Sequence, residues 1–574
     1  MSHRNNLYAV RAGGDLATAL YQRGQSIENL AFAQQNPQTL KTNRRLLLAQ
    51  YLFVLAFAVL GVRLGGLTLE TTTPPLVQVS QSPQFPQTLQ APRAIIKDRN
   101  DVILATQISM TILGADASAF DNPHDVVEQL KQIVPDLNTS RALRLLSGES
   151  RYVILQRGLT PHQHQAVLHL GNPALQLRPS PHRVYPTGAT AAHITGFADA
   201  DMQHGLSGLE QTLDKIEPTS SFTTTLDIRV QHIMRDALLS AMAAYKTKAA
   251  AAAIMNIHNG EIIALVSLPD FDANKPQASP TLNQFNRMTF GVYELGSIFK
   301  IFTAAMALES GAVTVTETFE TSQPLQIGGY QITDIHGQDH ALTIDEIVAY
   351  SSNIGSALLA LRVPAQTHYD FLADLSFTEP LYFDLPETAH PIFPTRWTDI
   401  ERATSSFGHG LAITPLHALV ATAAMVNGGV LYPPSLRRID VPVGRRVISA
   451  DTSAHLRRIM RSVISDGTGR KADVEGYPML GKTGSANKPQ DGKYSDDALV
   501  TSFVGAFPAQ NPRYALMVML DEPQGTDETF GFSLAGWNAA PVAAEIISRA
   551  ALFLGVMPSR VHPQAKTIGG ADAS

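Results

Sequence analysis

The sequence predicts a protein of the α/β class, in which a single N-terminal transmembrane helix precedes an elongated α+β module and a C-terminal domain with an antiparallel sheet flanked by helices. Three observations support this prediction. An uncharged apolar run lies near the N-terminus, a proline-rich tether leads from it into short strand and helix patterns, and strand-like runs stand at both ends of the remaining sequence with long apolar helices between them. The chain has 574 residues, more than one domain usually holds.

The composition excludes several classes of protein. Charged residues make up 16% of the chain and the formal net charge is −6, so no basic excess is available to neutralise the phosphates of a nucleic acid. The chain has no cysteine, which excludes disulfides, thiolate zinc sites, iron–sulfur clusters and cysteine nucleophiles. We therefore expect neither a nucleic-acid partner nor thiol chemistry.

The apolar run predicts a membrane anchor. Residues 46–62 carry no charge, and Arg63 can snorkel to the interface so that the span extends to residue 69. The alternatives are a buried core helix and a cleaved signal peptide, which would begin nearer the N-terminus and end in a small-x-small site. Before the run, six basic residues face two acidic ones: Arg4, Arg11, Arg23, Lys41, Arg44 and Arg45 against Asp15 and Glu28. This bias predicts a cytoplasmic tail over residues 1–45, an anchor over residues 46–69 and an extracytoplasmic location for the rest.

Residues 70–224 are predicted to form the first extracytoplasmic module. Its tether, residues 71–92, contains five prolines. Further on, Thr160 followed by Pro161 predicts the start of a helix that ends at Gly171. Three histidines lie on this helix: His162, His164 and His169. Because residues two apart do not share a helix face, we favour a solvated polar face over a metal site.

Residues 225–558 are predicted to form the second domain. Apolar residues recur at helical spacing after Thr225, and two strand-like runs follow around Asn259-Gly260, which is a hairpin signal. Two more strand-like runs, at residues 499–509 and 513–523, lie near the end of the chain. Since helices separate the two groups of strands, the C-terminal half must complete the sheet. Residues 559–574 are small and polar and are predicted to be a flexible tail.

The run from Gly296 to Gly311 carries the first chemical signal. It is apolar nearly all round, which predicts a buried helix, and Gly311 is expected to cap its C-terminus. The run places Ser297 and Lys300 one turn apart on one face. A lysine in apolar surroundings has a lowered pKa and can act as a base at neutral pH. A serine at a helix N-terminus lies beside free backbone N–H groups that can stabilise an oxyanion.

Two further motifs follow in a fixed order. Each pattern is weak alone: S-x-x-K recurs at Ser485 to Lys488, where no apolar helix follows, and S-x-N recurs within the same segment, so we interpret these copies as chance. The ordered combination is specific. Ser297 and Lys300 are followed 54 residues later by the Ser351–Asn353 motif and 131 residues after that by Lys482-Thr483-Gly484-Ser485.

This triplet resembles the motifs of the class B penicillin-binding proteins, which are monofunctional D,D-transpeptidases of cell-wall synthesis. The likeness covers most of the chain: residues 92–106, 183–197 and 205–210 resemble the N-terminal pedestal, or dimerisation-like domain, of this family, and residues 502–525 resemble its closing strands. Together with residues 535–547, the short tail and single span look most like the septal, division-specific type. The resemblance implies a pedestal over residues 70–224 and a penicillin-binding domain, of the serine transpeptidase and β-lactamase type, over residues 225–558.

The sequence departs from the family pattern at four positions. Ala94 and Asp101 stand where glycine is usual, which puts the local turn of the pedestal in doubt. Leu295 replaces the usual proline before Gly296, and Ser485 replaces threonine but keeps a hydroxyl.

The resemblance implies a catalytic role for five residues. Ser297 attacks the penultimate D-alanine carbonyl of a stem pentapeptide and forms an acyl-enzyme, and neutral Lys300 takes its proton. Ser351 relays a proton to the departing D-alanine, and Asn353 orients Lys300 and the peptide amide. Lys482 adds positive potential for the substrate carboxylate and disfavours charge on Lys300.

Three more residues are implied to bind substrate. The hydroxyls of Thr483 and Ser485 bind the substrate carboxylate, and Gly484 lets the strand approach the substrate closely. The backbone N–H groups of Ser297 and Ser485 are expected to form the oxyanion hole. No metal or organic cofactor is implied.

The implied partners are donor and acceptor stem peptides, β-lactam antibiotics and divisome proteins, including a lipid-II glycosyltransferase. The expected location is the bacterial inner membrane, with the N-terminus in the cytoplasm and the catalytic domain in the periplasm. Alternatives are an elongation-type class B transpeptidase, a β-lactam hydrolase or sensor, and a catalytically silent divisome scaffold. The intact triplet opposes the scaffold, and no E-x-x-L-N segment for deacylation follows Ser351. A glycosyltransferase is not expected, because residues 70–224 contain no E-D-x-x-F box.

Overall fold

The computed structural model describes residues 51–63, 93–148, 150–216, 220–335, 337–490 and 493–559. The chain divides into two compact units, Met1–Gln90 and Ala91–Ser574. In the first unit, residues 51–63 form a helix with exposed side chains. Within the described ranges, no helix is both long and apolar enough to cross a membrane. The predicted cytoplasmic tail, both ends of the predicted anchor and nearly all of the predicted C-terminal tail lie outside the described residues.

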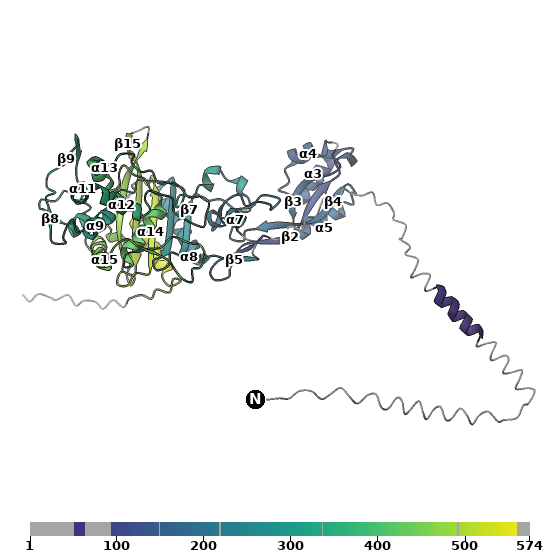
Figure 1. Cartoon of the computed structure of the whole chain (residues 1–574). Helices are drawn as coiled ribbons and strands as arrows, with labels where there is room; N and C mark the ends of the chain where they lie inside the picture. Colours follow the sequence, from purple (N-terminus) through teal and green to yellow (C-terminus); the bar gives the residue numbers. More distant parts are fainter. Residues whose placement is uncertain are drawn as a thin grey trace, which may run out of the picture. The chain divides into compact units, whose positions relative to one another are not determined.

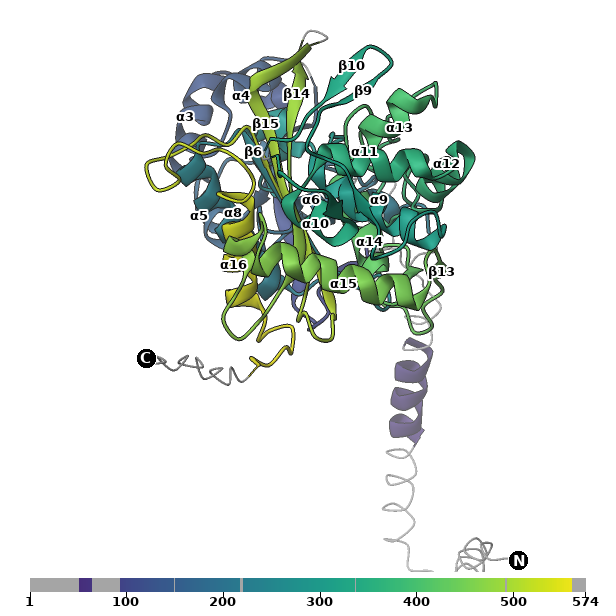
Figure 2. The same cartoon turned by 90° about the vertical axis from the view of Figure 1, so that its left-hand side faces the viewer.

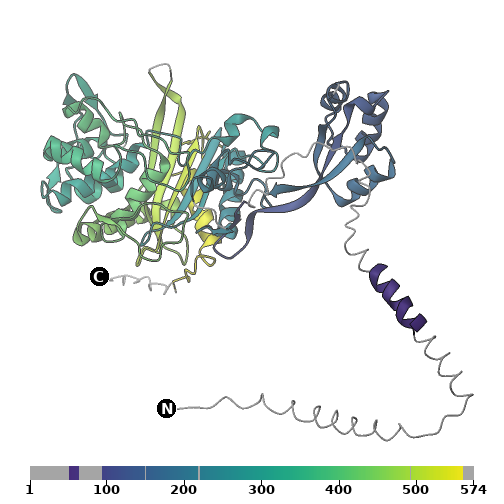
Figure 3. The same ribbon diagram turned by 45° about the vertical axis from the view of Figure 1, so that its right-hand side comes forward.

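In the second unit, the N-terminal part is a five-stranded sheet with helices packed against it, which we call the pedestal (Figure 1). The strand order is β3-β2-β1-β5, and β4 also pairs with β2. β2 and β4 are the long strands, paired antiparallel over ten positions, and Figure 3 shows them in blue. The elements are β1 (Ile95–Lys97), β2 (Ile103–Ala115), η2 (Ala117–Ala119), α3 (Pro123–Ile133), α4 (Thr139–Leu146), β3 (Val153–Leu159), α5 (Pro161–His169), β4 (Leu175–Val184), α6 (Ala192–Thr195), α7 (Gly208–Leu213) and β5 (Ser221–Thr223).

Two sequence-based expectations about the pedestal can be compared with its structure. α5 begins after Thr160, whose hydroxyl accepts a hydrogen bond from the N–H of Gln163 in a capping box, which confirms the predicted helix start. The turn between β1 and β2 holds Asp101 at a φ of 64°. Aspartate tolerates this left-handed conformation, and the carboxylate of Asp98 stabilises the turn by accepting hydrogen bonds from two backbone N–H groups. The turn therefore forms without the glycine that the family usually has there.

The C-terminal part is built on one antiparallel sheet in the order β14-β15-β16-β6-β7. Strands from both ends of this part lie side by side, as the sequence predicted, and β6 and β7 form the predicted hairpin with Gly260 at a φ of 82°. The strands are β6 (Ala249–Asn256), β7 (Ile262–Leu268), β14 (Leu480–Gln490), β15 (Lys493–Phe507) and β16 (Tyr514–Asp521).

Helices cover both faces of this sheet (Figure 2). Successive side chains of a strand point to opposite faces, and alternate residues of β6 and β16 accordingly belong to two different apolar clusters. One cluster contains residues of α8 (Ile228–Tyr245) and α16 (Ala539–Ala550), and the other contains residues of α9 (Phe299–Glu309), α14 (Pro415–Val426) and α15 (Ala450–Ser465). This arrangement explains why every residue of β16 is buried.

The segment between β7 and β14 supplies the remaining helices and short strands. They are η3 (Pro276–Ala278), η4 (Thr281–Gln284), η5 (Gly296–Ile298), β8 (Thr318–Phe319), β9 (Leu325–Ile327), β10 (Tyr330–Ile332), β11 (Leu342–Thr343), α10 (Ile344–Tyr350), α11 (Asn353–Arg362), α12 (Ala365–Asp374), α13 (Asp399–Ser405), β12 (Val430–Leu431), β13 (Arg445–Arg446) and η6 (Arg470–Ala472).

Candidate active site

Ser297 lies in a tight turn at the start of a buried helix. The turn is η5, and α9 follows it directly, with Gly311 at a φ of 68° after its last turn, as predicted. Gly296 has a φ of 59°, and a Cβ atom there would lie 2.6 Å from the carbonyl oxygen of Ser485. Glycine is therefore required for the turn to pack against β14. Leu295, in place of the usual proline, is buried in the core.

Lys300 brings three of the predicted residues together. Only 1% of it is exposed, because apolar neighbours surround α9. Its Nζ atom lies 2.9 Å from the Oγ atom of Ser297, 3.1 Å from the Oγ atom of Ser351, 2.6 Å from the Ser351 carbonyl oxygen and 2.7 Å from Oδ1 of Asn353. The structure thus joins the first two motifs at one nitrogen atom.

The electrostatic surroundings of Lys300 favour its neutral form. Burial lowers its pKa well below the usual value, and the nearby ammonium of Lys482 lowers it further, while the carboxylate of Asp334 acts in the opposite direction. A neutral amine has two N–H donors and one lone pair. It can donate to the Ser351 carbonyl and to Asn353 and still accept the proton of the Ser297 hydroxyl.

The second motif lies between two helices. α10 ends at Tyr350, and Ser351 follows with a φ of 63°, a strained conformation for a residue with a side chain. Ser352 caps α11 by accepting a hydrogen bond from the N–H of Gly355. This turn holds the Ser351 hydroxyl between the two lysines, since Nζ of Lys482 donates to it at 3.0 Å.

Asp334, a residue that the sequence reasoning missed, supports this turn. Its carboxylate accepts hydrogen bonds from the Ser352 hydroxyl at 2.6 Å and from the backbone N–H groups of Asn353 at 2.5 Å and Ile354 at 3.0 Å. It lies just after the three-residue strand β10, where no periodic pattern marks it in the sequence.

The third motif lies on β14. Lys482 is fully buried, and burial lowers its pKa to about 7. The Oγ1 atom of Thr483 lies 2.8 Å from that of Thr468, and the Ser485 hydroxyl accepts a hydrogen bond from the N–H of Ala535 at 3.1 Å. Thr468 is a second residue that the sequence reasoning missed, although the Gly-Thr-Gly sequence around it is a turn signal.

Gly484 has a packing role that the sequence analysis did not predict. A Cβ atom on Gly484 would lie 2.3 Å from the carbonyl oxygen of Leu295 and 2.9 Å from a side-chain carbon of Ile298. The missing side chain therefore lets β14 approach the turn that carries Ser297. The expectation that Gly484 also lets the strand approach the substrate closely stays a prediction.

A cavity of about 630 Å³, which we call the serine cavity, lies above these residues. Five of the eight predicted residues line it: Ser297, Ser351, Asn353, Thr483 and Ser485. The other three, Lys300, Lys482 and Gly484, are not among its lining residues. Thr468 and Trp537 complete the walls. The described residues contain no group of three His, Asp or Glu side chains that could hold a metal ion.

The second S-x-x-K copy has a structural explanation. Lys488 lies on a strand, where its Nζ atom is 2.8 Å from carboxylate oxygens of both Asp521 and Glu522. It takes no part in the serine cavity, as the sequence analysis expected.

Comparison with known families agrees with this geometry. Residues 250–548 match the family described as the penicillin-binding protein transpeptidase domain, and residues 88–216 match the penicillin-binding protein dimerisation domain. The chain belongs to the class B penicillin-binding proteins. Both expected domains of this family are therefore present.

Similar proteins cover most of the chain. A protein of Caulobacter vibrioides named probable peptidoglycan D,D-transpeptidase FtsI is 36% identical over 83% of this chain and 84% of its own length. Stage V sporulation protein D of Bacillus subtilis is 31% identical over 90% of this chain and 87% of its own length. The peptidoglycan D,D-transpeptidase FtsI of Escherichia coli is 29% identical over 84% of this chain and 86% of its own length. The crystal structure of a peptidoglycan synthetase from Bifidobacterium adolescentis, 21% identical, shows the same fold with a TM-score of 0.64, over 82% of this chain and 96% of that one. As a class B penicillin-binding protein with a transpeptidase domain, the chain is a peptidoglycan D,D-transpeptidase.

Proposed function

We propose that this penicillin-binding protein cross-links stem peptides during septal cell-wall synthesis, through an acyl-enzyme on Ser297. The observation that carries the chemistry is the contact of Lys300 Nζ with Ser297 Oγ at 2.9 Å, in surroundings that favour a neutral lysine. The septal role is supported by the relatives named FtsI.

Acylation uses the groups around Ser297. The Oγ atom attacks the carbonyl carbon between the two D-alanines while Lys300 accepts its proton. The oxyanion that forms accepts hydrogen bonds from the backbone N–H groups of Ser297 and Ser485. Lys300 then passes the proton through the Ser351 hydroxyl to the leaving nitrogen, and the C–N bond breaks to release D-alanine.

Transfer to the acceptor reverses these proton movements. An amine of a neighbouring stem attacks the ester carbonyl and loses a proton through Ser351 to Lys300. The Ser297 oxygen then takes the proton back as the ester bond breaks and a new amide forms.

The hydroxyls of Thr483, Ser485 and Thr468 bind the carboxylate of the donor's terminal D-alanine, because they converge in the serine cavity. A β-lactam carries a similar carboxylate and an amide that can acylate the same serine.

Labelling tests the proposed nucleophile. Full-length protein in detergent is treated with a labelled penicillin, and the modified peptide is identified by mass spectrometry. We expect label on Ser297 alone and none in the Ser297→Ala variant. Label that persists in this variant, for instance on Ser485, would refute the assignment.

Depletion tests the septal role. In the native bacterium, loss of a septal transpeptidase leaves elongation intact, so we expect long filaments with blocked septa. Round or swollen cells that still divide would instead indicate an elongation enzyme.

The same proposal places the protein in the inner membrane. The uncharged run and the basic residues before it support an anchor at residues 46–69, a cytoplasmic N-terminus and a periplasmic catalytic domain. A reporter active only in the periplasm should function after Ser574 and fail at Asn36, and the reverse pattern would refute this topology. Cross-linking also needs glycan strands. We propose that a lipid-II glycosyltransferase of the divisome supplies these strands.

A further inference from the structure

An exposed aromatic cluster adjoins the serine cavity. It consists of Phe530, Phe532 and Trp537, in the loop between β16 and α16. The ring of Phe532 stacks on that of Trp537 with the ring centres 5.3 Å apart, and the ring of Phe530 meets Trp537 edge-on at 5.8 Å. Trp537 lines the serine cavity, whereas the two phenylalanines do not. The cluster therefore extends the wall of the serine cavity onto the surface.

The fold exposes the two phenylalanines at a cost. Phe530 is 77% exposed and Phe532 is 51% exposed, although both are large apolar side chains. Phe530 also has a φ of 53°, which is strained for a bulky residue. The loop is nevertheless ordered, since the N–H of Gly531 donates to the carbonyl oxygen of Thr526 at 2.9 Å. A strained ring that adds nothing to the core points to a ligand.

The surroundings of the cluster suit a sugar. One face of a pyranose ring presents C–H bonds that pack against an aromatic ring, while the hydroxyl and amide groups at its edge form hydrogen bonds. The Nζ atom of Lys471 lies 4.0 Å from the centre of the Trp537 ring, and Asp527 and Glu528 are exposed in the same loop. Stem peptides are joined to the amino sugars of a glycan strand, so the substrate of a peptidoglycan transpeptidase carries such rings.

The position of the loop indicates which strand brings the sugar. The N–H of Ala535, in this loop, donates to the hydroxyl of Ser485, which in the proposed function binds the carboxylate of the departing D-alanine. Since transfer reverses the acylation step, the attacking amine must occupy the place that the departing nitrogen leaves. The acceptor therefore enters at the end of the serine cavity where Ser485 and the aromatic loop lie.

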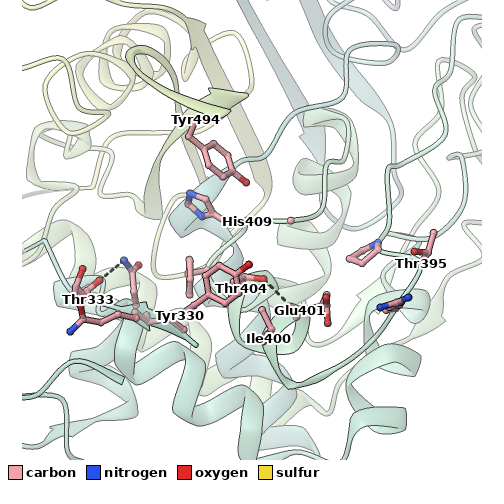
Figure 4. Close-up of a pocket in the computed structure, with 15 residues that line it drawn as sticks. Tyr330, Thr333, Thr395, Ile400, Glu401, Thr404, His409 and Tyr494 are labelled. Atoms are coloured by element: carbon pink, nitrogen blue, oxygen red, sulfur yellow. Dashed lines mark hydrogen bonds between the residues drawn. The ribbon is translucent and has the colours of Figure 1, made fainter. Parts of the chain in front are cut away.

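A second cavity, of about 720 Å³, does not compete for this assignment (Figure 4). Asn353 lines both cavities, and His409 and Tyr494 lie together at the wall of the second one. No residue of the aromatic cluster is among the lining residues of this second cavity. The cluster thus adjoins the serine cavity alone of the two.

We propose that Phe530 and Phe532 bind the glycan of the acceptor strand by stacking against its sugar rings. A stem pentapeptide has three residues before its two D-alanines, and three extended residues span about 10 Å. The sugar of an acceptor whose amine has reached Ser297 therefore lies outside the serine cavity, where the two rings are exposed. This inference rests on the proposed function and adds to it a preference for acceptors that carry sugar.

Tryptophan fluorescence tests binding without any reaction. The chain has two tryptophans, so in a Trp397→Phe variant the emission comes from Trp537 alone. Full-length protein, in a detergent without a sugar headgroup, is titrated with the uncharged tetrasaccharide of N-acetylglucosamine. We expect a saturable change in emission. Adding Phe532→Ala should raise the half-saturation concentration at least about tenfold, because a stacking partner is lost.

A transfer assay assigns the sugar site to the acceptor. Ser297 is acylated by a thioester analogue of the donor that contains no sugar, and transfer to a stem peptide is measured with and without its disaccharide. We expect the disaccharide to lower the concentration for half-maximal transfer at least about tenfold, and Phe532→Ala to reduce this advantage to about twofold or less.

Two further variants separate binding from a structural role. Phe530→Gly removes the ring together with the strain at its positive φ, so it should reduce the disaccharide advantage while the melting temperature stays the same or rises. Tyr382→Ala is the matched control, since Tyr382 is an exposed aromatic residue that lines neither cavity. It should bind the tetrasaccharide and use both acceptors as its parent does.

Three results would overturn the inference. The tetrasaccharide could leave the emission of Trp537 unchanged, or the disaccharide could give the acceptor no advantage, or Tyr382→Ala could match Phe532→Ala. Each of these leaves the labelling of Ser297 intact, and so leaves the proposed function standing. Absence of any acylation at Ser297 would instead refute both.

Discussion

The Nζ atom of Lys300 has four oxygen atoms within hydrogen-bond distance, which is more than its protons can serve. A charged lysine would keep its own charge buried and could not accept the proton of the Ser297 hydroxyl. A neutral lysine resolves both problems, since it donates to two oxygens and accepts from the Ser297 hydroxyl. The same atom is therefore a hydrogen-bonding centre for the site and a base for the reaction.

Asp334 offers a test of this view at a residue that does not touch substrate. Its carboxylate favours the charged form of Lys300, so Asp334→Asn should lower the pKa of Lys300 further. The rising limb of the rate of penicillin acylation against pH should then move to lower pH. Because Asn keeps an oxygen for the N–H groups of Asn353 and Ile354, the melting temperature should fall only slightly.

The conservative substitution is paired with a disruptive one. Asp334→Ala removes the acceptor as well, displaces Asn353 and should slow acylation by about tenfold or more. If Asp334 only stabilised the fold, both variants would lower the melting temperature and neither would move the pH limb.

At the scale of elements, the sequence predicts what depends on local patterns. The buried helix α9, the β6–β7 hairpin and the helix start at Thr160 follow from apolar spacing, an Asn-Gly pair and a cap, and the structure has all three. Asp334 could not be predicted in this way, since it lies in an irregular segment and acts on residues further along the chain. The same holds for Gly484. Its packing role depends on the close approach of the Leu295 carbonyl oxygen, nearly two hundred residues earlier in the chain.

The contact at Gly484 predicts a large effect of one methyl group. In Gly484→Ala, the new Cβ atom would meet the backbone oxygen of Leu295 and must push β14 away from η5. We expect acylation of Ser297 to slow by about 10²-fold, because misplacement by about 1 Å can cost that much. Gly337→Ala is the control, since nothing lies within 4 Å of its Cβ position. A Gly484→Ala variant that acylates at the wild-type rate would contradict this packing.

At the scale of the whole molecule, the pedestal and the catalytic domain belong to one compact unit. The Tyr185 N–H donates to Asn274, the Gly208 N–H donates to Glu387, and the Thr212 hydroxyl donates to the carbonyl oxygen of Asp384. The sequence predicted the order of the domains, but it could not predict these contacts, which join segments far apart in the chain.

Glu210 holds the pedestal side of this junction together. It is fully buried and pairs with Arg183 at 2.6 Å and Arg93 at 2.7 Å. Glu210→Ala leaves a buried positive charge unpaired, so we expect a loss of about 3–5 kcal/mol in unfolding free energy, measured by denaturant unfolding. The exposed pair of Glu545 with Arg549 is the control, and Glu545→Ala should cost at most about 1 kcal/mol. Equal effects of the two substitutions would contradict the role of Glu210.

The central claim is that Lys300 is the base that activates Ser297, and Lys300→Arg tests it most directly. Arginine keeps the positive charge but cannot lose its proton at any accessible pH. The rate of Ser297 acylation by penicillin, measured on full-length protein together with its melting temperature, should fall by at least about 10²-fold while the melting temperature changes little. An acylation rate within about tenfold of the wild type would contradict the claim.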